Sequence, residues 1–168
     1  PAGHLIGQNL HSQNPNDVFL INIHTGGFAN PQGPGTDFRV DPIGANIASQ
    51  SNLSGYPAGT VNRHQFSMSQ GGGTAMGRTD WTTAANQMLN VPSPVNVGMQ
   101  ANMDMATNTL TVDVEVYYTA AQTVTSNMRN VAVVQHNVEG PQTGGSSNNP
   151  GGMLPNGNYN HQHMLRHM

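Results

Sequence analysis

The chain has 168 residues, enough for one ordinary domain or two small ones. Only 8% of them are charged and the net charge is −3, without the concentrated basic patch that nucleic-acid binding requires. The sequence contains no cysteine, which excludes disulfides and thiol-based metal or redox sites within these residues. No apolar run approaches the ~20 residues that would cross a bilayer as a helix.

The first half of the chain is patterned for helices around one strand. Apolar residues at helical spacing predict a short amphipathic helix over 1–12. The apolar run 18–23 predicts a strand buried on both faces, and a Gly- and Pro-rich loop follows at 25–36. Asp41 suits the N-cap of a second helix, which Gly55 ends.

The next stretch is predicted to contain two short strands and a helix. Residues 56–63 lead into the first strand and 64–69 form the second. Asp80 is a good N-cap for a helix with an apolar face. The two prolines in 91–94 fit neither a helix interior nor a central strand, so this segment is predicted to be a linker.

After the linker the apolar period changes from helical to alternating. Segments 95–103 and 110–116 alternate apolar and polar residues, and 106–108 between them favours a turn. The pattern predicts an antiparallel hairpin whose apolar face is buried in a β-sandwich-like module, by way of Leu110, Val112, Val114 and Val116.

The C-terminal part is predicted to contain further strands around a long loop. A strand is expected at 131–134, and the alternation at 159–168 predicts another. Between them, 140–158 is rich in Gly, Asn, Ser and Pro and predicts a mobile surface loop. Because this loop lacks the apolar residues to fold on itself, we expect it to contact partners.

Together these elements predict an α+β protein of two units. The element order in 1–91 resembles a thioredoxin-like α/β unit that lacks its first strand, and 95–168 is predicted to be the β-rich module. In the thioredoxin fold an X-Pro bond before the third strand is cis and faces the redox motif, and a cis bond there would expose backbone groups to a bound partner. Tyr56 and Pro57 occupy this place, so we expect a cis bond and a peptide- or partner-contacting surface there.

Four motifs occur in an order that resembles the outer membrane protein twenty-eight family of Bacteroidota surface lipoproteins. They are Pro1-Ala2-Gly3-His4, the segment from Gly55 to Arg63, Gly140-Pro141-Gln142, and the segment from Asn158 to Arg166. The resemblance covers nearly the whole chain. The Tyr-Pro…Asn-Arg and Tyr-x-His-x-His-x-Leu-Arg segments are its specific parts.

The resemblance implies location and fold more directly than activity. It implies an exported protein of the outer membrane or cell surface, in agreement with the low-charge composition. Family members typically carry a Cys-x-x-Cys just before the Pro-Ala-Gly that opens this chain, so the resemblance implies cysteines immediately upstream of Pro1. Independently, the sequence has no initiator Met or signal peptide at Pro1 and stops at Met168 just after a patterned segment, so we expect a fragment truncated at both ends. The family motif also implies structural roles for His163 and Arg166, and we expect Arg63 to pair with a carboxylate or with loop carbonyls.

Three histidines near the C-terminus are the clearest candidate metal ligands. On a strand, His161, His163 and His167 would share one face, where neutral imidazoles could bind zinc or copper. His136 or Glu139 could supply a fourth ligand. The alternative is that these histidines are structural, and the sequence favours it. Asp113 and Glu115, two apart on one strand face, are expected to be a solvated pair rather than catalytic groups.

No complete catalytic motif lies in the chain, and the sequence predicts no cofactor. The leading hypothesis is a cell-surface binding or structural subunit of a larger assembly with other surface or outer-membrane proteins. The first alternative is a thiol–disulfide oxidoreductase with its Cys-x-x-Cys upstream of Pro1. The second is a histidine-based metal-binding surface protein.

Overall fold

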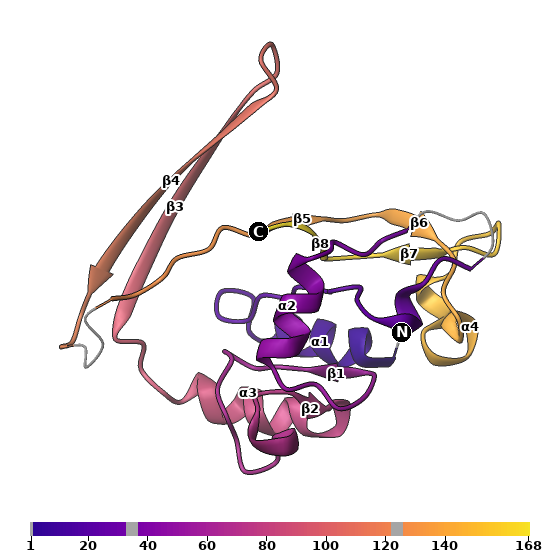
Figure 1. Cartoon of the computed structure of the whole chain (residues 1–168), viewed down its shortest axis with the longest axis horizontal. Helices are drawn as coiled ribbons and strands as arrows, with labels where there is room; N and C mark the ends of the chain where they lie inside the picture. Colours follow the sequence, from indigo (N-terminus) through magenta and orange to yellow (C-terminus); the bar gives the residue numbers. More distant parts are fainter. Residues whose placement is uncertain (1, 33–36, 122–125) are drawn as a thin grey trace. The chain divides into compact units, whose positions relative to one another are not determined.

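The computed structural model describes residues 2–32, 37–121 and 126–168 and shows an α+β protein (Figure 1). The chain forms two compact units. One combines Pro1–Leu89 with Asn130–Met168, and the other is Asn90–Arg129. This division differs from the predicted one, because the last 39 residues belong with the N-terminal half rather than with the hairpin.

In the N-terminal half, helices form near the positions that the sequence predicts. Helix α1 covers Ala2–Gln13, α2 covers Ile43–Gln50 and α3 covers Trp81–Leu89. Pro42, not Asp41, is the N-cap of α2, and that helix ends at Gln50, ahead of Gly55. Three 3-10 turns accompany these helices: η1 at Gly27–Ala29, η2 at Gln70–Gly72 and η3 at Arg78–Asp80.

The prediction of a strand buried on both faces at 18–23 is wrong. Only Asn22 makes a β-bridge, to Met164, and the Phe19 side chain is 77% exposed. Burial requires a layer on each side of the strand. The apolar run alone cannot supply these layers.

A small core lies beneath α3. Strands β1 (Ala58–Gly59) and β2 (Met76–Gly77) pair antiparallel, and Phe66, Met76 and Ala84 form the buried cluster. The indole N–H of Trp81 donates to the carbonyl of Met76 at 3.2 Å. Residues 64–69 form no strand, because only Ser67 and Met68 have a defined local structure, a turn, and the rest of the segment is irregular. The Tyr56-Pro57 bond is cis, as predicted.

The C-terminal strands pair with each other across the chain (Figure 1). Strand β5 (Val133–Gln135) pairs with β8 (Met164–His167), and β6 (Val138–Gly140) pairs with β7 (Tyr159–His161), both antiparallel. Asn22 ties this region to the N-terminal half. Its N–H donates to His163 O at 2.7 Å, and its carbonyl accepts from Leu165 N at 2.9 Å. Met164 and Leu165 are fully buried as a result.

The stretch 140–158 is folded, so the prediction of a mobile loop there is wrong. It contains helix α4 (Gly145–Asn148) and the 3-10 turn η4 (Pro150–Gly152). Asn149 between them is buried and hydrogen-bonded to Tyr159. Hydrogen bonds of side chains and backbone groups, including those of Asn148 and Asn149, help to hold this segment together.

The hairpin prediction is confirmed, and the burial prediction for it is wrong. Strands β3 (Val95–Asp104) and β4 (Thr109–Tyr118) pair antiparallel over ten residues each in unbroken register. Leu110 is exposed, and its three apolar neighbours on β4 are only half-buried: Val112, Val114 and Val116. Among the described residues β3 and β4 pair only with each other, as a two-stranded sheet.

Within the three described ranges, no helix is both long and apolar enough to cross a membrane.

Candidate functional site

The first candidate site is a hollow edged by two exposed aromatic rings. Phe28, in η1, is 85% exposed and Tyr56 is 44% exposed. Their ring centroids lie 5.7 Å apart in an edge-to-face arrangement. The hollow beside them has a volume of about 530 Å³ and is also lined by residues of α2 and the turn after it, including Ala48, Leu53 and Ser54. We call this site the aromatic hollow.

The aromatic hollow has the chemistry of a protein-contact surface. Large apolar rings are usually buried, and aromatic side chains with one free face are enriched at protein interfaces. Tyr56 and Pro57, the residues that the sequence singled out for partner contact, are both exposed, and Tyr56 lines the hollow. Phe28 joins them from a loop that the sequence analysis did not single out.

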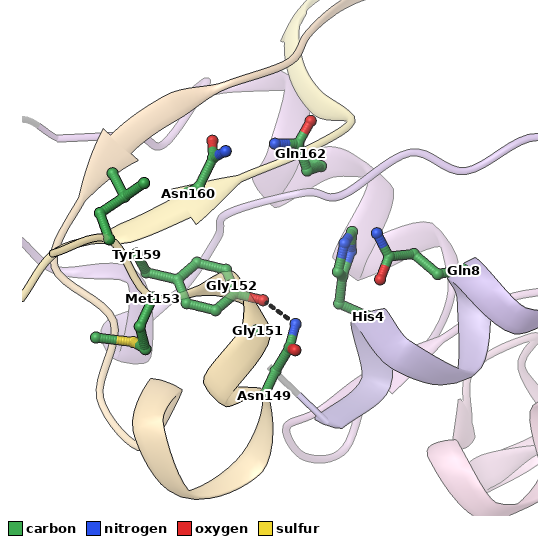
Figure 2. Close-up of a pocket in the computed structure, with 10 residues that line it drawn as sticks. His4, Gln8, Asn149, Gly151, Gly152, Met153, Tyr159, Asn160 and Gln162 are labelled. Carbon is green, nitrogen blue, oxygen red and sulfur yellow. Dashed lines mark hydrogen bonds between the residues drawn. The ribbon is translucent and has the colours of Figure 1, made fainter.

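The second candidate site is a pocket of about 340 Å³ in the same unit (Figure 2). His4 and Gln8 of α1 form one side, and Asn149, Tyr159, Asn160 and Gln162 line it from the C-terminal part. The remaining lining comes from Gly151, Gly152, Met153 and Leu154. We call this site the amide pocket.

Hydrogen bonds behind the amide pocket fix several of its side chains. Asn149, only 7% exposed, donates from Nδ2 to the hydroxyl of Tyr159 at 2.7 Å. The Nδ2 of Asn160 and the Nε2 of Gln162 both donate to Oδ1 of Asn137, at 3.3 and 2.9 Å. Their orientation is therefore set before any ligand arrives.

The amide pocket carries no formal charge at neutral pH. None of its lining residues is Asp, Glu, Lys or Arg. Burial, and next the neighbouring His163, lower the pKa of His4 from 6.5 to about 4, so its imidazole is neutral. The Nδ1 of His4 lies 3.2 Å from Nδ2 of Asn22.

The C-terminal histidines do not share a face, so the predicted alternation is wrong there. The backbone of His163 has φ 53°, a left-handed conformation that separates β7 from β8. His161 packs against His24 and Phe38, with ring centroids at 5.3 and 5.2 Å. The ring of His163 instead lies near those of three other histidines, His4, His11 and His136.

The half-buried imidazole of His24 and the buried imidazole of His161 are both held neutral. Burial, followed by the proximity of His161 and Arg166, lowers the pKa of His24 to about 4. Burial also lowers the pKa of His161 and that of His163. Nδ1 of His24 and Nε2 of His161 are buried without a hydrogen-bond partner among the described residues, which disfavours a charge on either ring.

The described ranges contain no group of three or more side chains arranged to hold a metal ion. His167 is exposed on β8. Glu139 is engaged elsewhere, because its Oε1 accepts from the side-chain amides of Asn156 and Asn158 at 2.7 Å each. These two hydrogen bonds lower the pKa of Glu139.

The arginines implied to be structural lie at the surface. Arg63 is exposed, with φ 51°, and makes no hydrogen bond or ion pair with any residue that the structure describes. Arg166 is exposed on β8, close enough to influence the pKa of His24.

His163 does connect parts of the chain, through its carbonyl to Asn22 and its ring to α1. Asp113 and Glu115 are both exposed on β4.

Sequence reasoning missed the amide pocket. Its residues come from three separated segments of the chain, and the amides among them have no spacing that marks a site. The only available signal was the abundance of Asn and Gln around Tyr159, which the sequence divides between a predicted surface loop at 140–158 and a predicted strand at 159–168.

Comparison with known proteins adds no family to this picture, because the chain matches no family model, no curated protein sequence and no solved structure.

Proposed function

We propose that this chain is a binding module of the cell surface or outer membrane, and that the aromatic hollow is its contact with protein partners. The exposed edge-to-face pair of Phe28 and Tyr56 carries the proposal. Two large rings beside a concave surface lose water-exposed apolar area when a partner covers them. The partner's contacting element is an extended peptide segment that places an apolar side chain in the hollow.

The composition and the family resemblance support the location. A surface covered mainly by amides, hydroxyls and glycine docks through shape and hydrogen bonds, and few charges need to lose their hydration. The motifs around Tyr56 and Tyr159 resemble those of surface lipoproteins, which supports an exported assembly subunit.

Peptide selection tests the proposed contact. Peptides displayed on phage and selected against the wild-type chain should bind roughly tenfold more weakly to Phe28→Ala and Tyr56→Ala. Tyr117→Ala is the matched control, because Tyr117 is also exposed but lies on the hairpin. If the selected peptides bind all three variants equally, the peptide contact does not lie at the aromatic hollow.

The competing proposal is a thiol–disulfide oxidoreductase. A thiolate is the nucleophile in disulfide exchange, and this chain contains no cysteine, so it should not reduce insulin by itself. Rapid insulin reduction by a longer form that carries a Cys-x-x-Cys ahead of Pro1 would favour the enzyme over the binding module.

A further inference from the structure

We propose that the amide pocket binds a neutral, hydroxyl-rich ligand of the size of a mono- or disaccharide. The amide pocket and the aromatic hollow share no lining residue. Sugar binding in the pocket therefore does not depend on the function proposed above.

The polarity of the pocket selects the ligand class. A side-chain amide offers both a donor and an acceptor, and a sugar hydroxyl is likewise both. Gln8 presents a side-chain amide at the pocket, together with the hydroxyl of Tyr159. The amides of Asn160 and Gln162 are instead bonded to Asn137. A neutral lining gives no compensation for stripping water from a carboxylate, a phosphate or an ammonium group, so charged ligands are disfavoured.

Free hydrogen-bonding atoms remain at the pocket after the internal bonds are counted. Within the part of the chain that the structure describes, the Gln8 amide and Oδ1 of Asn149 have no hydrogen-bond partner. Nε2 of His4 is also free there, because the contact of that ring with Asn22 uses Nδ1. These atoms come from opposite sides of the pocket in Figure 2, as the recognition of a small ligand requires.

Preorganisation and size support the same ligand. Asn149 is locked between its side-chain bond to Tyr159 and backbone bonds to Gly145 and Gly152, so ordering it costs little on binding. The volume of about 340 Å³ lies at the lower end of the roughly 300–1,000 Å³ of small-molecule sites. A ring or two of a sugar fits such a volume, and a folded partner does not.

Titration of the full chain tests the proposal. Calorimetry and saturation-transfer NMR would use glucose, galactose, N-acetylglucosamine and their disaccharides, with glucuronic acid and a blocked neutral tripeptide as comparators. At least one neutral sugar should bind with a dissociation constant below about 10 mM. Glucuronic acid should bind more weakly than glucose.

Two substitutions of Gln8 test whether the sugar binds in the amide pocket. Gln8→Ala should weaken sugar binding roughly three- to tenfold by removing one hydrogen-bonding group, and Gln8→Trp should abolish binding by filling the space. Gln13→Ala is the matched control, because Gln13 is exposed on the same helix and does not line the pocket. Unchanged melting temperatures would show that all three variants fold.

Three results would overturn the proposal. One is the absence of saturable binding by any neutral sugar up to about 10 mM. Another is sugar binding that survives Gln8→Trp. The third is binding of the blocked tripeptide in place of the sugars, which would identify a peptide site.

Discussion

The hairpin and the C-terminal strands show two opposite relations between sequence pattern and burial. Strands β3 and β4 alternate regularly and pair over ten residues each, yet none of their residues is buried. Strands β7 and β8 are short and interrupted at His163, yet Tyr159, His161, Met164 and Leu165 are all buried. Alternation therefore predicts pairing, whereas burial depends on a second layer that the pattern does not identify.

The difference follows from the hydrogen bonds that Asn22 makes. Its backbone and side chain hold residues 162–165 beside the N-terminal half, and its Nδ2 donates to Gln162 O at 2.7 Å. Among the described residues β3 and β4 form a sheet of two strands. A two-stranded hairpin is marginal in water by itself, so the stability of the chain should reside in the larger unit.

The largest expected effect compares two methionines. Met164 is fully buried, and Met99 on β3 is 67% exposed. Met164→Ala should lower the free energy of unfolding by about 2–5 kcal/mol, because it leaves a cavity, and Met99→Ala by less than about 0.5 kcal/mol. Urea denaturation of both variants measures the difference. Equal losses would mean that the hairpin face is covered in solution.

A smaller effect compares two glycines. A Cβ at Gly152 would lie 2.5 Å from the Tyr159 ring, whereas at Gly98 on β3 the nearest atom would be 3.9 Å away. Gly152→Ala should destabilise by roughly 1–3 kcal/mol through overpacking. Gly98→Ala should be neutral or slightly stabilising, because alanine has less backbone freedom to lose. Thermal melts measure both, and a neutral Gly152→Ala would contradict the tight packing of Tyr159.

Acid should weaken the histidine-containing unit and leave the hairpin unaffected. His4 and His24 have folded pKa values of about 4 against 6.5 in the unfolded chain, so the unfolded state binds more protons between these values. Their contribution to stability is therefore complete above pH 6.5 and is lost as the pH falls towards 4. His24 faces His161 and Arg166, and His4 faces His163, all of which oppose a second positive charge.

The expected loss is about 1–2 kcal/mol, less than the full shifts imply, because both rings remain partly open to screening water. Urea denaturation at pH 7 and pH 4.5 measures it. His24→Gln should reduce the pH dependence, with His64→Gln as the control, since His64 is exposed. Segment 90–129 has no histidine, so hydrogen exchange across the hairpin, corrected for its intrinsic pH dependence, should not change over this range.

The sequence predicted local structure well and long-range structure poorly. Helical spacing located α1 and α3, and alternation located both hairpin strands and their turn. These signals need only neighbouring residues. The exposure of Phe19, the burial of Met164 and the separation of His161 from His163 depend on which distant segments meet. A single left-handed residue, His163, was enough to invalidate the shared face of the three histidines.

The candidate sites follow the same rule. Tyr56 and Pro57 were identified from a local motif. Phe28 and the amide pocket were not, because their partners are distant in sequence. Asn149 illustrates the reason: in the sequence it lies in a run of Gly, Asn and Ser, and only its bond to Tyr159 gives it a defined place.

The smallest expected effect lies in the hairpin turn. Asn108 has φ 53°, a left-handed conformation that asparagine tolerates better than alanine, so Asn108→Ala should cost about 0.5–1 kcal/mol. Asn102→Ala, on an exposed position of β3, is the control. Because the hairpin is its own unit, the cost should appear as a roughly two- to fivefold faster hydrogen exchange of β3 and β4 amides, with the melting of the larger unit unchanged. A matching fall in the melting temperature of that unit would show that the two regions unfold together, and the contrast between them would then not extend to their stability.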